Sequence, residues 1–298
     1  MMSTTAHTTV TGLPNRIRRG AGRRNGGRRI GSHVLLIVLA LYFIVPLWWL
    51  FVASTKSTPE LFGTAPFWFG DITHFADNIA GLFTAKGGVY WRWIGNSFLY
   101  AFAGGVGATV LAVLAGYGFA KFSFRGKNVL FLLVMLTFLL PSQLATIPQF
   151  LMMTELGWVG ELKSVIVPSL AGAFGIFWLR QFFQNSVRTE LIEASTIDGC
   201  GFFRQYFHVA LPSGRSAIAF LGMFTFIGSW NDFMWPLIVL NDPDRLTLQV
   251  ALSQLQTTHG TDYGMLMMSA LIAVVPLILV FIIGAKQFIA GITDGAVK

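Results

Sequence analysis

Charged residues are scarce in this 298-residue chain, and their scarcity excludes an ordinary soluble domain. Asp, Glu, Lys and Arg make up 11% of the sequence, whereas soluble domains carry about 25%. Hydrophobic residues make up 54%, and the mean hydropathy is +0.64. A water-soluble core of this length cannot hide so much apolar surface. We therefore expect an all-α membrane protein.

Cysteine is almost absent. The single residue, Cys200, excludes an internal disulfide and a cysteine-based zinc cluster. The five histidines are scattered without the spacing of metal ligands, and no His-Glu-x-x-His motif is present. We expect no metal site.

Catalytic motifs are also missing. No Gly-x-x-x-x-Gly-Lys-[Ser/Thr] sequence occurs, because Gly126-Lys127 is followed by Asn128 and position 121 is a lysine. The chain therefore has no phosphate-binding loop and no ATP site of its own. Gly-x-Ser-x-Gly is absent as well. We expect no catalytic residue, no cofactor and no enzymatic activity.

The first 33 residues contain no acid and seven arginines: Arg16, Arg18, Arg19, Arg23, Arg24, Arg28 and Arg29. Nothing in this segment can form a core, so residues 1–33 are predicted to be a disordered basic cytoplasmic tail. A nucleic-acid-binding arm is the weaker interpretation, because no folded domain with interleaved aromatic residues supports it. We expect no nucleic-acid partner.

Six apolar segments follow: Val34–Ala53, Ile94–Ala120, Val129–Met153, Val165–Phe183, Ala217–Val239 and Met265–Ala285. The first is longer than the apolar stretch of a signal peptide, and Pro46 is expected to kink or end it. The second carries a row of small residues that permits close helix packing, within the chain or with another subunit: Gly104, Ala108, Ala112 and Gly116. We expect six transmembrane helices, several of them bent by proline.

The cations are distributed unequally between the predicted loops. Of the 21 Lys and Arg residues, 16 lie in four segments: the N-terminal tail, residues 121–127, residues 180–215 and the C-terminus. Because cytoplasmic loops carry the excess of cations, both termini are predicted to lie in the cytoplasm.

The cytoplasmic loop 185–215 has structure of its own. The pattern predicts a short helix that is ended by Gly199, then a second short helix, then Pro212 at the start of the next span. Ala194 and Ser195 are small enough for a partner to approach closely, and Glu193 and Asp198 offer charge. A loop of this length with its own structure is usually functional.

At these residues the sequence resembles the inner-membrane permeases of ABC importers. Their signature is Glu-Ala-Ala, three residues, Gly, nine residues and Ile-x-Leu-Pro. The matching positions are Glu193-Ala194-Ser195, Gly199, Val209 and Leu211-Pro212. Ser195 and Val209 are small departures from the family pattern. The resemblance implies the type I importer permease fold and a coupling helix that contacts a separate ATPase; Glu193, Ala194, Ser195, Asp198, Gly199, Leu211 and Pro212 would form that contact.

A closer resemblance covers residues 34–298, the predicted transmembrane domain. Several short motifs resemble those of the carbohydrate-uptake permeases: Asn96-Ser97, Gly116–Ala120, Pro141-x-Gln143, Ile147-Pro148 and Trp230–Phe233. The ending 291–298 resembles the second of their two permeases, the maltose-permease G type. The resemblance implies a second permease subunit, two ATP-binding subunits and an extracytoplasmic solute-binding protein in a prokaryotic inner membrane. It also implies that residues 291–298 of the C-terminal tail 286–298 run between the ATPases, with Gly291, Thr293 and Gly295 as candidate contacts.

Asp232 is the only acid within a predicted span. An acid at membrane depth costs about 2.5–3.5 kcal/mol on insertion scales and is a candidate functional residue. Trp230, Asn231 and Asp232 suit a sugar path, because sugars stack on aromatic faces and hydrogen-bond through hydroxyls. Gln143 and Asn96 are further candidates. A structural role, in which these groups bond to neighbouring helices, remains open for all five.

Three functions are compatible with these features. The first is a permease that imports a sugar or oligosaccharide. The second is a permease of the same class for glycerol phosphate, peptide or another solute. The third, an ion-coupled secondary transporter, is expected to show paired repeats and several intramembrane ionisable residues, and this sequence has one acid and no clear repeat.

Overall fold

The structure is a computed structural model that describes residues 25–84, 87–255 and 261–296, and every regular element in those ranges is helical. The first elements are α1 (Asn25–Ala53), α2 (Thr58–Gly63), α3 (Ile72–Thr84), α4 (Tyr90–Lys121), α5 (Lys127–Leu139), η2 (Ser142–Ala145), α6 (Thr146–Glu155), α7 (Lys163–Ser169) and α8 (Ala173–Ser186). The remaining elements are α9 (Thr189–Ile197), α10 (Phe202–Gln205), the π-helical turn η3 (Tyr206–Ala210), α11 (Leu211–Ser213), α12 (Arg215–Trp230), α13 (Met234–Val239), η4 (Pro243–Arg245), α14 (Leu248–Gln254) and α15 (Tyr263–Ala296). The chain divides into two units, Met1–Trp49 and Leu50–Lys298.

Four helical stretches are long and apolar enough to cross a membrane. They are Ile30–Ala53, Tyr90–Lys121, Lys163–Ser186 and Tyr263–Gln287. Two further pairs meet the same criteria together but bend sharply, Lys127–Leu139 with Ser142–Glu155 by 98° and Phe202–Ser213 with Arg215–Trp230 by 80°. Each bent pair counted as one span gives the six spans that the sequence predicts.

Proline has different effects in different spans. The 98° bend lies at Pro141, which follows Leu140 in an extended conformation (φ −73°, ψ 133°). The residue before a proline avoids the helical region, and proline itself cannot donate to the preceding turn. Pro46 and Pro276, by contrast, lie inside α1 and α15, which continue past them. Pro46 therefore does not end the first helix, which extends to Ala53.

Two predicted boundaries differ from the structure. The predicted span Ala217–Val239 is interrupted after Trp230, and its last part is the separate helix α13. Asn231 caps this break by donating from Nδ2 to the Ile227 carbonyl (2.9 Å), because short polar side chains compete with the helical backbone bonds. At the other end of the chain, residues 25–33 of the predicted tail are helical, because a formed helix extends more easily than it begins. Residues 1–24 of that tail lie outside the described residues.

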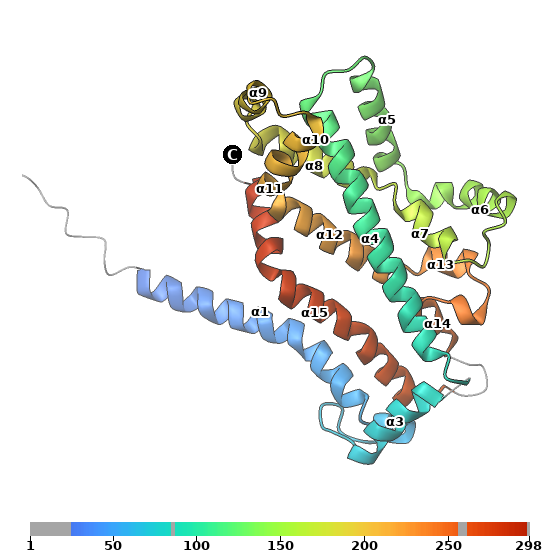
Figure 1. Cartoon of the computed structure of the whole chain (residues 1–298). Helices are drawn as coiled ribbons and strands as arrows, with labels where there is room; N and C mark the ends of the chain where they lie inside the picture. The colour runs from blue at the N-terminus through green and yellow to red at the C-terminus, as the bar shows by residue number, and fades with distance from the viewer. Residues whose placement is uncertain (1–24, 85–86, 256–260, 297–298) are drawn as a thin grey trace, which may run out of the picture. The chain divides into compact units, whose positions relative to one another are not determined.

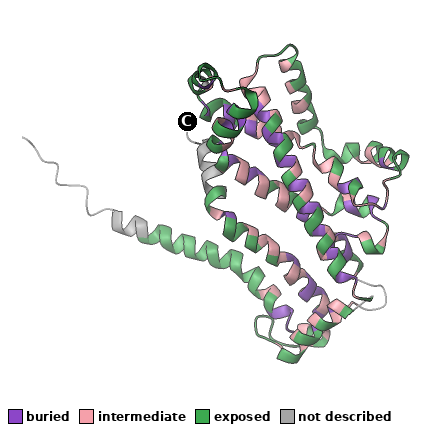
Figure 2. Cartoon of the chain, in the orientation of Figure 1, coloured by how far each residue is buried: buried purple, intermediate pink, exposed green. Residues whose placement is uncertain are grey.

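In the second unit α4 packs along α8 and α12, and α12 packs along α15 (Figure 1). Buried residues follow the length of α4 (Figure 2) and include the whole row of small residues. A Cβ atom on Gly116 would lie 2.9 Å from the Leu179 Cβ and 3.0 Å from the Arg180 backbone nitrogen. The small residues therefore allow close contact within the chain, which is the first of the two roles predicted for them.

Apolar side chains form two buried clusters, one at each end of α4. One surrounds Tyr90, Trp93 and Trp230 and includes residues of α14 and α15. The other surrounds Tyr117 and Phe183 and includes residues of α8, η3 and α12. Figure 1 shows α9–α11 and the last described turns of α15 at the second end, and α3 and α14 at the first.

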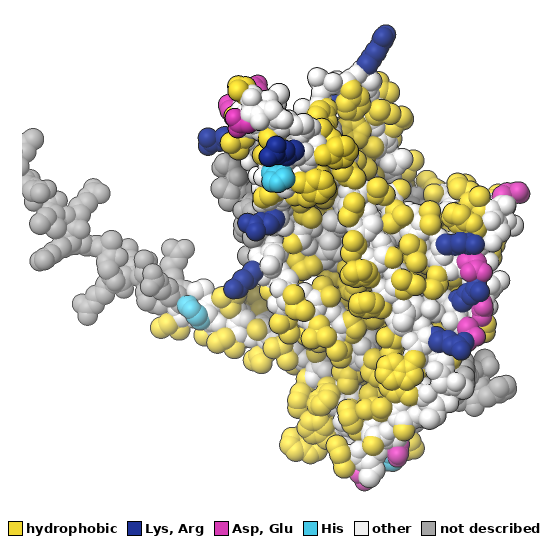
Figure 3. Space-filling view, viewed as in Figure 1, with side chains coloured by type: hydrophobic (Ala, Val, Ile, Leu, Met, Phe, Trp, Pro, Cys, Tyr) yellow, Lys and Arg dark blue, Asp and Glu magenta, His cyan; other side chains and the backbone are white. Residues whose placement is uncertain are grey.

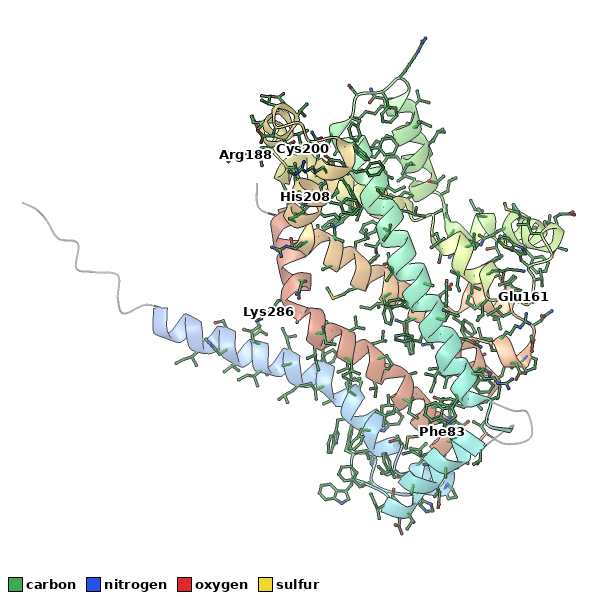
Figure 4. The ribbon with its side chains drawn as sticks, in the orientation of Figure 1. Phe83, Glu161, Arg188, Cys200, His208 and Lys286 are labelled. Carbon is green, nitrogen blue, oxygen red and sulfur yellow. The ribbon has the colours of Figure 1, made fainter. Side chains whose placement is uncertain are left out.

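Ion pairs join the loops at the α14 end. Arg245 pairs with Glu161 and with Asp242, and Arg92 pairs with Asp244 at 2.6 Å. Figure 3 shows cationic and anionic side chains alternating along one edge of the molecule, and Figure 4 places Glu161 on that edge. The Arg245–Glu161 pair joins the α6–α7 loop to the α13–α14 loop, and the Arg92–Asp244 pair joins α4 to the α13–α14 loop.

Candidate functional site

The predicted coupling segment folds as an elbow, which we define as residues 187–214. Its helix α9 begins after Arg188, which is extended (φ −64°, ψ 137°), and Glu190 lies in the first turn, where a negative charge favours the helix dipole. Its end has the two bonds of a Schellman motif: Cys200 N–H donates to the Ser195 carbonyl (2.9 Å) and Gly199 N–H to the Thr196 carbonyl (3.0 Å). Gly199 has the required left-handed conformation (φ +77°).

Most of the outer face of α9 is exposed. Glu193, Ala194 and Asp198 are exposed, whereas Ser195 is buried and donates its hydroxyl to the Ile192 carbonyl (2.7 Å). Of the other predicted coupling residues, Leu211 is half-buried and Pro212 is exposed in the first turn of α11.

Two apolar side chains of α9 are also exposed, Leu191 at 51% and Ile197 at 87%. Figure 4 shows this end of the molecule, with Arg188, Cys200 and His208 labelled. These apolar side chains belong to a helix outside the predicted spans, so their exposed surface is free for contact with a partner protein.

The elbow is attached to the transmembrane helices through aromatic side chains. The Phe202 ring lies 5.0 Å from the Phe122 ring and 6.1 Å from the Tyr117 ring, measured between centroids. Tyr206 also contacts Tyr117 (5.8 Å), which in turn contacts Phe183 (5.6 Å). The elbow therefore packs against the end of α4, which in turn contacts the end of α8.

A polar pocket lies between α4, η2, α6, α7 and the α12–α13 break. Its volume is about 270 Å³ and its lining is Tyr100, Ser142, Gln143, Thr146, Gln149, Val165, Pro168, Ser169, Asp232, Met234 and Trp235. A neighbouring pocket of about 280 Å³ shares Tyr100, Ser169 and Asp232 with it. Nearly all the polar groups of this lining are neutral, and Asp232 is its one carboxylate.

Asp232 accepts a hydrogen bond from α4. The Tyr100 hydroxyl donates to Asp232 Oδ2 at 2.8 Å. Asp232 itself lies in the α12–α13 break, two residues before α13 begins. The break in the fifth predicted span therefore places Asp232 at the pocket, where Tyr100 holds it.

The structure brings together some predicted path residues and separates others. Gln143 and Asp232 line the same pocket, although they lie 89 positions apart in sequence. Trp230 is 2% exposed and donates from Nε1 to the Ala273 carbonyl, so its ring lies in the core. Asn231 bonds within α12, as described above. Asn96 donates to the carbonyls of Asp244 and Leu246 (both 3.0 Å) and so joins α4 to the α13–α14 loop.

The sequence reasoning missed several lining residues. Five of them lie in apolar segments and were assigned to no motif: Tyr100, Ser142, Thr146, Gln149 and Ser169. A search for hydroxyl and amide groups within the predicted spans would have found them, but it could not have told which of them share a pocket.

The predicted C-terminal contacts lie on helical backbone. Because α15 extends to Ala296, Gly291, Thr293 and Gly295 belong to its last turns. Side chains from residue 288 onward lie outside the described residues, so the role of these three positions remains a prediction.

Comparison with known proteins places this arrangement among transport proteins. The family described as "Binding-protein-dependent transport system inner membrane component" matches residues 108–293. The arabinooligosaccharides transport system permease protein AraQ of Halalkalibacterium halodurans is 33% identical over 87% of this chain and 93% of its own length. The lactose transport system permease protein LacG of Rhizobium radiobacter is 31% identical over 90% of this chain and 96% of its own. The sn-glycerol-3-phosphate transport system permease protein UgpE of Yersinia pestis is 29% identical over 90% of this chain and 97% of its own.

A solved structure has the same fold. It is described as a bacterial ABC transporter involved in the import of the acidic polysaccharide alginate. The TM-score is 0.77 at 22% sequence identity, over 90% of this chain and 99% of the other.

Proposed function

This chain belongs to the family of binding-protein-dependent transport system inner membrane components, the permease subunits of ABC importers, and from this membership we propose that it imports a sugar or oligosaccharide. Relatives named for arabinooligosaccharide and lactose transport support that substrate class. The polar pocket supports it independently, because hydroxyl and amide side chains are the groups that hydrogen-bond sugar hydroxyls. In this proposal Gln143, Asp232 and Tyr100 line part of the substrate path.

Glycerol phosphate is the second candidate, because a glycerol-3-phosphate permease is also a relative. The pocket lining argues against it: Asp232 is a carboxylate, and the residues around it include neither lysine nor arginine. A phosphate in this pocket would be repelled by Asp232 and would find no cation to bind.

The second half of the proposal concerns the elbow: we propose that α9 docks on a separate ATP-binding subunit. The observation that supports it most directly is the exposure of α9 and its end, which includes the carboxylates of Glu193 and Asp198 and the apolar side chains of Leu191 and Ile197. The complete importer would contain a second permease, two ATP-binding subunits and an extracytoplasmic solute-binding protein. Gly291, Thr293 and Gly295 would lie near the ATP-binding subunits, because the last turns of α15 lie at the same end of the molecule as α9 (Figure 1).

Energy for transport would come from ATP hydrolysed by the partner subunits. Movement of α9 would shift the helices between outward-open and inward-open states, and the flux would follow the populations of these states. The elbow and both termini would then face the cytoplasm, as the distribution of cations predicts.

Co-purification and energised uptake together test the proposal. The tagged chain, expressed with its native neighbouring genes and extracted in mild detergent, should bring down an ATP-binding subunit. Uptake of labelled oligosaccharides by cells should fall when ATP is depleted and survive collapse of the ion gradients by an ionophore. An isolated chain with ionophore-sensitive uptake would instead indicate the ion-coupled secondary transporter.

A further inference from the structure

The link between α9 and α10 has the composition of a hinge. Gly199 and Gly201 flank Cys200, and no side chain crowds either glycine, because a Cβ built on each meets no atom within 4 Å. Glycine loses more conformational freedom on ordering than any other residue. A link of this kind, with nothing to brace it, would let α9 move without moving α10.

One buried side chain braces this link. Gln205, in the last turn of α10, is 6% exposed, and its Nε2 donates to Thr196 Oγ1 (2.8 Å) and to the Cys200 carbonyl (3.1 Å). Thr196 Oγ1 in turn donates to the Ile192 carbonyl (2.8 Å). The amide of Gln205 thus reaches back across the two glycines and joins α10 to the last turn of α9.

The first turn of α9 has an anchor of its own. Lys121, the last residue of α4, donates from Nζ to the Val187 carbonyl at 2.5 Å. Val187 is buried in the cluster around Tyr117 and lies two residues before α9 begins. The helix is therefore fixed to α4 at its start and to α10 at its end.

A displacement of α9 can continue from α10 into the membrane helices. Phe202, at the start of α10, and Tyr206, directly after Gln205, pack on Tyr117 of α4. The π-helical turn η3 and α11 then lead into α12. Since α4 carries Tyr100 and α12 ends beside Asp232, the same two helices hold the pocket at their far ends.

We propose that Gln205 is a positioning residue that locks α9 to α10, so that motion of the docked helix reaches α4 and α12 instead of being lost in the two-glycine link. The inference rests on the proposed coupling role of α9. In this inference Gln205 keeps the elbow rigid, and the exposed face of α9 makes the docking contact.

The test uses Gln205→Met in the complete importer, because methionine keeps nearly the same volume and removes both hydrogen bonds. Each bond is a modest one, so uptake per ATP hydrolysed should fall roughly fivefold to tenfold, while the ATP-binding subunit still co-purifies. Gln254→Met, at an exposed position of α14, is the matched control and should leave uptake per ATP unchanged.

Cys200 gives a second readout that does not depend on transport. It is the only cysteine of the chain and lies inside the braced link, so its alkylation by a maleimide, measured on this subunit's band, reports opening of the elbow. Gln205→Met should speed this alkylation severalfold. Thr196→Val, which removes one of the two bonds from an exposed position, should give a smaller increase and covers the case in which the methionine variant does not fold and insert in the membrane.

The outcomes separate the inference from the proposed function. Wild-type alkylation and wild-type uptake per ATP in both variants would overturn the role of Gln205. Loss of the ATP-binding subunit from the Gln205→Met complex would also overturn it, because Gln205 would then act in docking. A wild-type chain that never co-purifies with an ATPase would instead refute the proposed function.

Discussion

Tyr100 and Asp232 show how one residue pair joins two helices at the pocket. The Tyr100 ring is 3% exposed, and its hydroxyl donates to the Asp232 carboxylate. We predict that Tyr100→Phe lowers the free energy of unfolding by about 1 kcal/mol, since it removes a hydrogen bond between two predicted spans. Thermal unfolding of the purified subunit in detergent measures this loss.

The control for this prediction is Tyr263→Phe, which removes a hydroxyl from a partly exposed ring at the start of α15. Its melting temperature should match that of the wild type. If Tyr100→Phe is as stable as the control, the Tyr100–Asp232 hydrogen bond contributes nothing to the stability of the fold.

Glu161 and Arg245 lie in loops between the predicted spans, and their ion pair makes the stability of the protein depend on pH. The Arg245 guanidinium lowers the pKa of the Glu161 carboxyl below its ordinary value of 4.5, and Glu161 in return raises the pKa of Arg245. A depressed carboxyl pKa stabilises the fold above the unfolded-state value and loses that contribution as pH falls through the folded-state value. Both side chains are 41% exposed, so the effect is small.

We predict that Glu161→Gln has a lower melting temperature than the wild type at pH 7, and that the difference disappears as pH falls below 4.5. Glu155→Gln, at an exposed position of α6, serves as the control and should match the wild type throughout. A difference that persists unchanged at low pH would show that the side chain acts by packing instead of charge.

At the scale of the element, α9 depends on how it ends. Gly199 and Gly201 both have space around them, but Gly199 has a φ of +77° and Gly201 a φ of −73°. A side chain in the left-handed region costs roughly 1–2 kcal/mol even where nothing is in its way. The two positions therefore separate backbone strain from crowding within one loop.

We predict that Gly199→Val abolishes most uptake while the protein still inserts in the membrane, because the Schellman end of α9 is disturbed. Gly201→Val should keep nearly wild-type uptake. Cell uptake normalised to membrane-inserted protein measures both. Normal uptake by Gly199→Val would count heavily against a coupling role for α9.

At the scale of the whole molecule, the orientation in the membrane decides which surface can meet the proposed ATP-binding subunit. Sixteen of the 21 cations lie in segments predicted to be cytoplasmic, and the elbow is one of them. Cys200 is the single thiol of the chain and is half-buried in the elbow. It therefore reports the side of the membrane without any engineered residue.

We predict that a membrane-impermeant maleimide labels Cys200 in inverted vesicles and not in intact cells. As the control, both preparations are opened with detergent before the maleimide is added, and Cys200 should then be labelled in each. Labelling of intact cells would place the elbow outside and reverse the proposed orientation.

The sequence by itself determined the class of the protein and the form of its elbow. Long apolar segments cannot be hidden in water, so the number of spans follows from hydropathy. The Gly199 end of α9 follows equally from local chemistry, because the αL conformation of a helix end favours glycine whatever lies around it.

Only the tertiary structure decided which polar groups share a site. Trp230 and Asp232 are two positions apart, yet one ring fills the core and the other side chain lines the pocket, because α12 ends between them. Gln143, Tyr100 and Asp232 meet only because α4, η2 and the α12–α13 break converge. The brace by Gln205 likewise depends on α10 folding back toward α9. Contacts between distant segments are set by packing, which no local pattern contains.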